Sequence, residues 1–555
     1  MRRRALIAVT TGLAAASLAG AAPAGAADPA TGRLLVSYDR GPAGAHSAAV
    51  HAGIARAGAR VAGPVLPRIG LVTVRPRPGM SARRTAERLR RQPGVARVEV
   101  EHRARLRYVA NDPALVQAEP TPGTPPGVTV EWWAAREDLL AAWDITRGSG
   151  AKVAVIDTGI DAEHPEFAGR IAGVTDLDAD PAHGPATVDE VGHGTHVASL
   201  ACAIGDNGVG IVGSGFGCSL LVFKSDLSDS SIAKAIVDAV DQGADAINMS
   251  FGTDGTTPAA TPVVQAVDYA YRHDVTMVAA AADEPVQEQG DPANILQPTG
   301  TGANHTLGKG LSVTAAEATD ARAPYAGFGT QISIAAYGSF ATQGPGPAGI
   351  LGAFPGNPTS LDAGEPGVRQ PCACRTVFNG DARYARIQGT SMATPMVAGV
   401  AALMHHLNPD LSAADVIRLL KDTARRPVGT SWTPELGWGI LDGGAAVQAA
   451  RRLDRRPPVS RVSARRGLRA GTVTLQLSGS DRAPTGCKPS GIARYELWRT
   501  VAGGRGQRVR TTRETRVHVA LRRGVRYGFY VRAVDRAGNR EAAPSRPDVR
   551  VRLKA

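Results

Sequence analysis

The sequence lacks any run of about 20 apolar residues, the length that a membrane-spanning helix requires. It also lacks a motif for reading nucleic acid. We therefore expect no membrane span and no specific nucleic-acid partner. Hydrophobic residues still make up 43% of the 555 residues, which is ample for buried cores in three or four domains.

Cysteine is scarce, and its five residues cannot all pair within one chain. Cys202 and Cys218 bracket a glycine-rich loop, so we predict that they form a disulfide. Cys372 and Cys374 are too close in the sequence to bond each other comfortably. Cys487 lies in the C-terminal tail, and at least one thiol is left over.

Residues 1–27 have the pattern of a secretory signal peptide. Three arginines precede an apolar run from Ala5 to about Ala19, and a small-residue cleavage pattern follows at residues 24–26. Because no later run could anchor the chain, we expect a soluble protein that is secreted to the extracellular medium. Disulfides are compatible with that compartment.

Residues 389–399 (GTSMATPMVAG) predict a reactive serine at the start of a helix. Gly389 permits a tight turn, and Ser391 lies where the unpaired N–H groups of a helix N-terminus gather. Pro395 is tolerated only near a helix start. Such an N-terminus favours the negative charge that develops during acyl transfer. An ordinary N-capped core helix is the alternative, so this stretch alone does not decide the function.

Two upstream stretches favour the chemical interpretation. The segment VAVIDTGID is an apolar strand that delivers Asp157 at its end, and GHGTHVA places His193 between glycines. The three motifs and their chain order resemble those of the subtilisin-like serine proteases, over about residues 132–450. The resemblance implies that Ser391 is the nucleophile, that His193 transfers its proton, and that Asp157 orients and stabilises the imidazole.

Single motifs also have simpler explanations. His193 and His196, at positions i and i+3, could form half of a zinc site, but the sequence nominates no third ligand nearby. An aspartate after a strand, such as Asp157, is often only a turn former. Neither alternative explains the joint order of the motifs.

We predict an α/β main domain, a small α+β domain before it and an all-β sandwich after it. Residues 131–452 alternate strands and helices, as in a doubly wound, mostly parallel sheet. Residues 28–110 are similar to the inhibitory propeptide of subtilisin-like proteases, with an unrelated α+β adaptor as the alternative. Residues 111–130 are rich in proline and glycine and predict an exposed linker. Residues 457–555 resemble an immunoglobulin-like or fibronectin type III sandwich.

The resemblance also nominates substrate-binding and oxyanion residues. Ser250, Phe251 and Gly252 match the stretch that pairs with an extended substrate backbone, although a plain strand end is the alternative. Where these enzymes usually place an oxyanion-donating asparagine, the sequence has Asp283. A charged Asp283 would repel the oxyanion, and loss of such a donor costs about 10²–10³ in rate.

We interpret the sequence as a secreted serine endopeptidase, made as a preproenzyme, that hydrolyses peptide bonds of proteins through an acyl-enzyme on Ser391. Its own propeptide is the expected intramolecular inhibitor. The chemistry requires no cofactor, but Glu166 and Asp206 fall roughly where the family can bind a structural calcium. The alternative function is a peptide-binding pseudoprotease, which only Asp283 favours.

Charge is segregated along the chain. Residues 1–110 carry a net charge of +14, residues 111–450 carry −21 and residues 451–555 carry +20. An acidic body is thus flanked by basic parts. A basic tail on a secreted protein predicts contact with anionic surfaces such as cell-wall polymers, or with the acidic body itself. A well-solvated sandwich without a ligand is the alternative.

Overall fold

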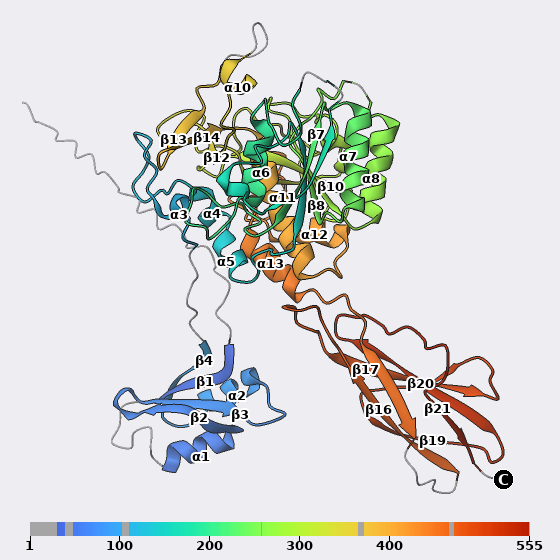
Figure 1. Ribbon diagram of the computed structural model, residues 1–555. Coiled ribbons are helices and arrows are strands. Elements are labelled where there is room, and N and C mark those ends of the chain that lie inside the picture. The colour runs from blue at the N-terminus through green and yellow to red at the C-terminus, as the bar shows by residue number, and fades with distance from the viewer. Residues whose placement is uncertain are drawn as a thin grey trace, which may run out of the picture. The chain divides into compact units, whose positions relative to one another are not determined.

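The computed structural model describes residues 30–38, 48–102, 110–178, 180, 183–256, 258–364, 371–464 and 471–553. The predicted signal peptide lies outside them. The chain divides into two units, Met1–Arg107 and Tyr108–Ala555 (Figure 1). Within the described residues, no helix is both long and apolar enough to cross a membrane.

The first unit contains a four-stranded antiparallel sheet, in the order β2-β3-β1-β4, and two helices that share its buried core. One helix begins after Ser81, whose side chain accepts a hydrogen bond from the N–H of Arg84. It buries Thr85, Ala86 and Leu89 and leaves its arginines exposed, so it is amphipathic. The elements are β1 (Ala30–Tyr38), α1 (Ala48–Arg56), β2 (Ala59–Leu66), β3 (Leu71–Pro76), α2 (Ala82–Arg90) and β4 (Val95–His102).

The main domain of the second unit is built on a seven-stranded parallel sheet, in the order β11-β10-β9-β8-β5-β7-β6. This confirms the predicted parallel sheet. The strands are β5 (Lys152–Asp157), β6 (Ile171–Leu177), β7 (Ser219–Ser225), β8 (Ala246–Met249), β9 (Thr276–Ala280), β10 (Gly310–Ala316) and β11 (Ile334–Tyr337).

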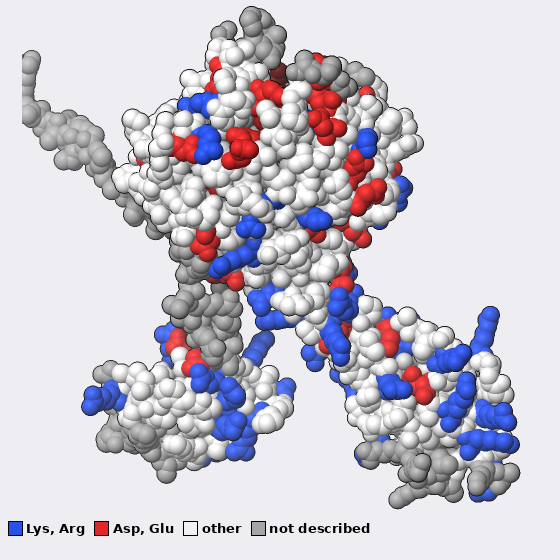
Figure 2. All heavy atoms as spheres, viewed as in Figure 1, with Lys and Arg blue, Asp and Glu red and all other residues white. Residues whose placement is uncertain are grey.

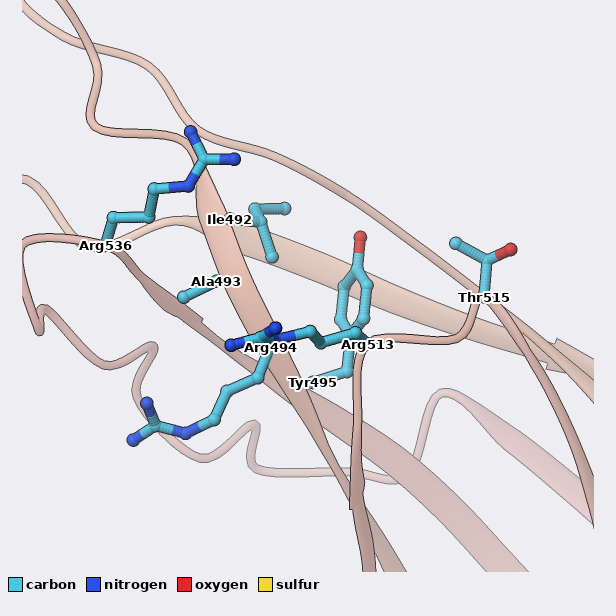
Figure 3. A pocket seen from close by; sticks show the side chains of 7 residues that line it. All are labelled: Ile492, Ala493, Arg494, Tyr495, Arg513, Thr515 and Arg536. Carbon is cyan, nitrogen blue, oxygen red and sulfur yellow. The ribbon is translucent and has the colours of Figure 1, made fainter. Parts of the chain in front are cut away.

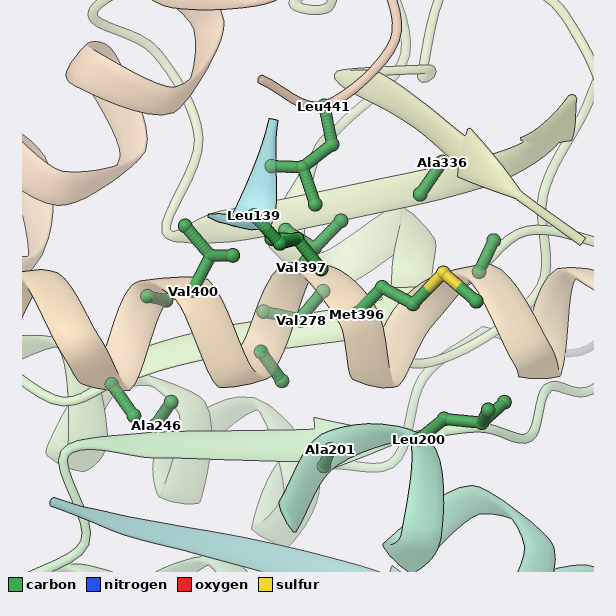
Figure 4. Close-up of a cluster of buried hydrophobic side chains, with 14 of the residues drawn as sticks. Leu139, Leu200, Ala201, Ala246, Val278, Ala336, Met396, Val397, Val400 and Leu441 are labelled. Carbon is green, nitrogen blue, oxygen red and sulfur yellow. The ribbon is translucent and has the colours of Figure 1, made fainter. Parts of the chain in front are cut away.

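Helices cover both faces of this sheet. Along β5, Val153 and Val155 belong to one buried cluster, and Ala154 and Ile156 belong to another on the opposite face. The first cluster includes residues of α6 (His193–Cys202) and α11 (Thr390–Leu407), and the second includes α7 (Asp229–Asp241) and α8 (Thr261–Arg272). Figure 4 shows α11 crossing the first cluster, where its side chains meet those of the sheet and of α6.

Shorter helices and a small antiparallel sheet complete the domain. The sheet, in the order β12-β14-β13, consists of β12 (Ile350–Ala353), β13 (Arg375–Phe378) and β14 (Asp381–Ile387). The helices are α3 (Pro113–Val116), α4 (Trp132–Arg136), α5 (Leu139–Trp143), α9 (Ala293–Leu296), α10 (Ser360–Ala363), α12 (Ala413–Thr423) and α13 (Gly443–Arg452).

Residues 111–130 are exposed only in part, because several of their side chains pack against the main domain. Asp112 is fully buried, and its carboxylate accepts a hydrogen bond from the N–H of Asp206 at 2.8 Å. Glu119 is also buried and forms an ion pair with Arg386 at 2.7 Å. The prolines and glycines make turns in this segment, but its acidic side chains are bound by donors of the main domain.

The structure joins Cys202 to Cys218, with 5.4 Å between their Cα atoms, as predicted. It also joins Cys372 to Cys374, which the sequence analysis considered too close to bond. The Cα atoms of that pair lie 5.0 Å apart, within the range that a disulfide spans. Cys487 is free and partly buried.

Residues 459–553 form two antiparallel sheets around one buried core, in the orders β15-β16-β19 and β18-β17-β20-β21. Alternation explains the packing: in β16, Val473, Leu475 and Leu477 are buried and the residues between them are partly exposed. The strands are β15 (Val459–Ala464), β16 (Thr472–Ser480), β17 (Ile492–Val501), β18 (Gln507–Thr512), β19 (Arg516–Ala520), β20 (Arg526–Asp535) and β21 (Val549–Arg552).

Candidate active site

Strand ends and helix starts position the three predicted catalytic side chains. Asp157 is the last residue of β5, His193 is the first residue of α6, and Ser391 is the second residue of α11. Two glycines allow the strand end and the first turn of α6 to approach closely, because a Cβ on Gly194 would overlap the carbonyl oxygen of Gly159. The carboxyl end of a parallel sheet is where such folds leave a crevice.

Asp157 and His193 form a hydrogen-bonded pair. The Nδ1 atom of His193 lies 2.7 Å from Oδ1 of Asp157, and the N–H of Thr158 donates to the same oxygen at 2.9 Å. Asp157 is buried, whereas the His193 side chain is 23% exposed. Burial lowers the pKa of His193, but the charge and hydrogen bond of Asp157 oppose this effect, and the resulting pKa is raised. The bond at Nδ1 leaves Nε2 available for proton transfer.

Ser391 is bound to the end of β8 by reciprocal hydrogen bonds. Its Oγ donates to the carbonyl oxygen of Ser250 at 3.0 Å, and Oγ of Ser250 donates to the carbonyl oxygen of Ser391 at 2.9 Å. Pro395 explains the second bond, because a proline four residues later has no N–H to bind that carbonyl within the helix. Asn248 donates to Oγ of Ser250 and holds it in place.

Asp189, which was not among the residues predicted from the sequence, binds both the segment after β5 and the start of α6. Its Oδ2 accepts hydrogen bonds from the N–H and the Oγ of Thr195, at 2.8 and 2.7 Å. Its Oδ1 accepts from the N–H groups of Val191 and Gly192 and from Oγ of Thr158, at 3.1, 2.8 and 2.9 Å. Asp189 is fully buried, and its charge also contributes to raising the pKa of His193.

Asp283 follows β9 and binds the start of α11. Its Oδ1 accepts hydrogen bonds from the N–H and the Oγ of Thr390, at 2.7 and 2.9 Å. Its Oδ2 lies on the side of Gly389, where a Cβ would come within 3.0 Å. The residue is exposed at the surface, but protein atoms crowd its carboxyl group, and this desolvation raises the pKa of Asp283. The hydrogen bonds from Thr390 act in the opposite direction.

The predicted substrate-binding stretch changes from buried to exposed within three residues. Ser250 is 2% exposed, Phe251 is partly buried, and Gly252 is exposed. Phe251 packs against the cluster on the α7 and α8 side of the sheet. The exposed backbone at Gly252 is therefore the part of the stretch that could pair with an extended peptide.

Comparison with known proteins identifies the family. A model of the subtilase family matches residues 148–439, more than half of the chain. The chain belongs to the subtilase family. A second model, of the fervidolysin N-terminal prodomain, matches residues 15–101. Subtilases are serine endopeptidases, so the chain is a hydrolase of this class and carries a prodomain.

Relatives of this subtilase include three bacterial proteases, each 31% identical to it. Thermitase of Thermoactinomyces vulgaris matches over 52% of this chain and 86% of its own length. A thermophilic serine proteinase of a Bacillus species matches over 52% and 60%, and an extracellular protease of Xanthomonas campestris over 66% and 62%. A solved protease structure from Pseudoalteromonas arctica is 26% identical and covers 60% of this chain and 99% of its own, with a TM-score of 0.47.

Glu166 and Asp206, the two residues suggested for calcium, do not form a calcium site together. Oε1 of Glu166 accepts hydrogen bonds from the N–H of Ile211 and the hydroxyl of Tyr384, at 2.7 and 2.8 Å. Burial raises the pKa of Glu166 to about 8. Asp206 instead faces Arg147, with 3.9 Å between the charged groups. Among the described residues, Oε2 of Glu166 is buried without a hydrogen-bond partner, but Glu166 and Asp206 do not belong to one group of possible metal ligands.

Within the described ranges, one group of three carboxylates has oxygens within 4.8 Å of one another: Asp454, Asp481 and Asp535. Backbone or amide donors already bind each of them, from Ser490, Gly491 and Asn539. None of the three belongs to the catalytic constellation. The structural calcium therefore stays a prediction without an assigned set of ligands.

Proposed function

We propose that this subtilase is a secreted serine endopeptidase that cuts proteins through an acyl-enzyme on Ser391. Oγ of Ser391 attacks the carbonyl carbon of the scissile peptide bond as its proton moves to Nε2 of His193. His193 then gives this proton to the leaving amine, and the acyl-enzyme remains. A water molecule, deprotonated by the same imidazole, hydrolyses the ester and restores Ser391.

The observation that carries this proposal is the 2.7 Å bond between Asp157 and Nδ1 of His193 at the edge where β5 and α6 meet. It fixes the tautomer and favours the imidazolium that forms in the transition state. The Ser391 hydroxyl bonds to Ser250 in this structure, so in this proposal it exchanges that bond for one to Nε2 when substrate binds.

We assign two donors to the oxyanion. The N–H of Ser391 lies in the first turn of α11, where backbone donors have no helical partner. The second donor is Oδ2 of Asp283 in its protonated form, because an ionised carboxylate has no donor. Thr390 occupies Oδ1 and so determines which oxygen remains for the substrate.

The other parts of the chain have supporting roles in this proposal. Residues 1–27 direct export, and residues 28–110 inhibit the enzyme until they are cut away, as the prodomain match supports. The extracellular protease among the relatives is consistent with secretion. Residues 457–555, a sandwich of immunoglobulin or fibronectin type III kind, bind an anionic polymer outside the cell.

A fluorophosphonate probe tests the proposed nucleophile. The mature protein should be labelled once per chain, on the peptide that contains Ser391, and labelling should depend on pH through His193. Ser391→Ala should abolish labelling, and Ser250→Ala is the matched control because it keeps the nucleophile. If the mature wild-type protein is folded and remains unlabelled, the assignment of Ser391 is wrong.

A further inference from the structure

The C-terminal sandwich contains a hollow of about 510 Å³ whose charged lining residues are all arginines. Figure 3 shows that these side chains come from different segments: Arg494 from β17, Arg513 from the β18–β19 connection and Arg536 from the turn after β20. All three residues are exposed. Three different segments of the sandwich therefore contribute cations to one concave surface.

Acids pair with some other arginines of the same sandwich. Arg540 binds Glu496, and Arg510 lies 3.5 Å from Glu514. Among the described residues, no acid forms an ion pair with the three arginines of the hollow, and the one side-chain hydrogen bond of Arg536 is to the carbonyl oxygen of Ser490 at 3.4 Å. Their charges are left for a ligand.

Neutral hydroxyl groups lie on the same lining. Thr515 and Tyr495 both contribute to it, and Tyr495 is only 7% exposed because its ring packs in the sandwich core. The hollow therefore has charged donors and hydroxyl groups, but no exposed aromatic face. Bases of single-stranded nucleic acids are usually held by stacking on such faces.

We propose that this hollow is a binding site for a polymer of polyol units joined by phosphodiesters. Guanidinium groups match the geometry of phosphate oxygens, and the hydroxyls of Tyr495 and Thr515 match the hydroxyl groups of the polyol. This site specifies the class of anionic polymer that we propose the basic sandwich binds, and it rests on that proposed function. It places the enzyme on a phosphate-rich surface outside the cell.

The wider charge pattern supports this ligand class. Residues 451–555 carry a net charge of +20, and Figure 2 shows blue side chains spread over the sandwich, with red ones more frequent on the main domain. The basic sandwich attracts a polyanion over a long range, while the hollow provides a place where several of its charges are contacted together.

The test measures binding of a fluorescently labelled glycerol-phosphate polymer to the full chain by anisotropy. All proteins carry Ser391→Ala to prevent self-digestion. One variant replaces the arginines of the hollow (R494Q, R513Q and R536Q). The matched control replaces three exposed arginines outside the hollow (R523Q, R526Q and R550Q) and so has the same net charge. Circular dichroism checks that both are folded.

We expect the hollow variant to bind at least about 10-fold more weakly and the control to lose less than about 3-fold. The slope of log affinity against log salt concentration should become less negative by about 2 in the hollow variant, because each of the three lost phosphate contacts contributes about 0.7 to that slope. Equal losses in the two variants would overturn the site and leave only general charge attraction. No binding by the parent chain would overturn the polymer proposal itself.

Two comparison ligands make the ligand class testable. An oligothymidylate of similar charge should bind more weakly than the glycerol-phosphate polymer, and polygalacturonate tests whether carboxylates suffice. The phosphodiester–polyol assignment would be contradicted if oligothymidylate or polygalacturonate bound as tightly as the glycerol-phosphate polymer, or more tightly, and if the hollow variant lost that binding. Fluorophosphonate labelling of the R494Q, R513Q and R536Q chain with Ser391 intact should be unchanged, so failure of this site and failure of the protease assignment are distinguishable.

Discussion

Asp189→Asn should separate two effects of one buried carboxylate on His193, namely its hydrogen bonds, which hold the start of α6, and its charge, which raises the pKa of the imidazole. Asp189 accepts five hydrogen bonds, three on Oδ1 and two on Oδ2. Asparagine keeps one oxygen, and its best orientation leaves the NH₂ group facing the N–H and Oγ of Thr195. The variant should therefore lose both bonds that Thr195 donates, and although the NH₂ group can donate to the Thr195 hydroxyl in return, the N–H of the fully buried Thr195 is left without an acceptor.

Hydrogen bonds to charged groups contribute about 1.5–3 kcal/mol each, so two of them amount to about 3–6 kcal/mol. The neutral amide is cheaper to bury than a carboxylate, which offsets part of this loss. We expect a net destabilisation of about 2–4 kcal/mol and a fall in maximal kcat/KM, because the first turn of α6 is held less firmly.

The change in charge gives the sharper readout. The charge of Asp189 raises the pKa of His193, so its removal should lower that pKa. His193 acts as a base only when neutral, and the neutral form then persists to lower pH. The acid limb of the kcat/KM profile should move to lower pH in Asp189→Asn.

Thr195→Val is the matched control for this assay. It removes a hydrogen bond to Asp189 but keeps the carboxylate charge, so it should lower stability without moving the acid limb. The measurement is kcat/KM for a chromogenic peptide from pH 5 to 10, together with the melting temperature of each variant. An acid limb that stays in place in folded Asp189→Asn, or moves to higher pH, would refute the electrostatic part of the reasoning.

Four further predictions concern other groups. Asp283→Asn should keep activity to higher pH, because an amide donates to the oxyanion at any pH; lower activity at every pH would give the acid a positive role. Ser391→Ala should accumulate as an uncut precursor, visible by mass spectrometry, and normal maturation of the purified variant would mean that another protease cuts it. Replacing Cys202 and Cys218 by serine should cost about 3 kcal/mol, measured as loss of thermal stability, and an unchanged melting temperature would exclude a stabilising bridge. Glu166→Gln should be as stable as the wild-type protein near pH 4 and more stable than it toward pH 8. The reason is that the pKa of Glu166 is raised to about 8 in the folded protein, whereas the unfolded chain ionises this group near 4.5. A variant that loses stability only in calcium-containing buffer would show that the carboxylate holds the ion.

The positions of the three residues that we propose as catalytic could be located from the sequence, because each belongs to a local pattern with a direct structural consequence. An apolar run that ends in an acid places Asp157 at a strand end, and glycines beside His193 allow the start of α6 to approach it. The parallel sheet followed from the alternation of strands and helices. These inferences need no knowledge of contacts between distant segments.

The missed features depend on contacts between distant segments. Asp189 resembles an ordinary turn residue in the sequence, and its role depends on donors from Thr158 and Thr195 that only the fold brings together. The packing of residues 111–130 was missed for the same reason, because Asp112 is buried by a loop that lies 94 residues later in the chain. Proline and glycine content predicts turns, but it does not predict whether those turns pack on a surface.

The acids around His193 place conflicting requirements on the working pH. The charges of Asp157 and Asp189 raise the pKa of the imidazole, and an ionised Asp283 would raise it further, so the neutral base requires higher pH. The proposed donor at Asp283 must instead stay protonated. Desolvation by the surrounding protein atoms favours this, because it raises the pKa of Asp283.

Two variants separate these requirements. Asp189→Asn removes a charge near His193, so it should move the acid limb of the profile to lower pH. Asp283→Asn replaces an acid that is already protonated on the acid limb, so it should leave that limb in place and extend only the alkaline limb, because it exchanges a titrating donor for a permanent one. Extension of the alkaline limb in both variants would mean that ionisation of Asp283 does not set it, and the second oxyanion donor would have to be sought elsewhere.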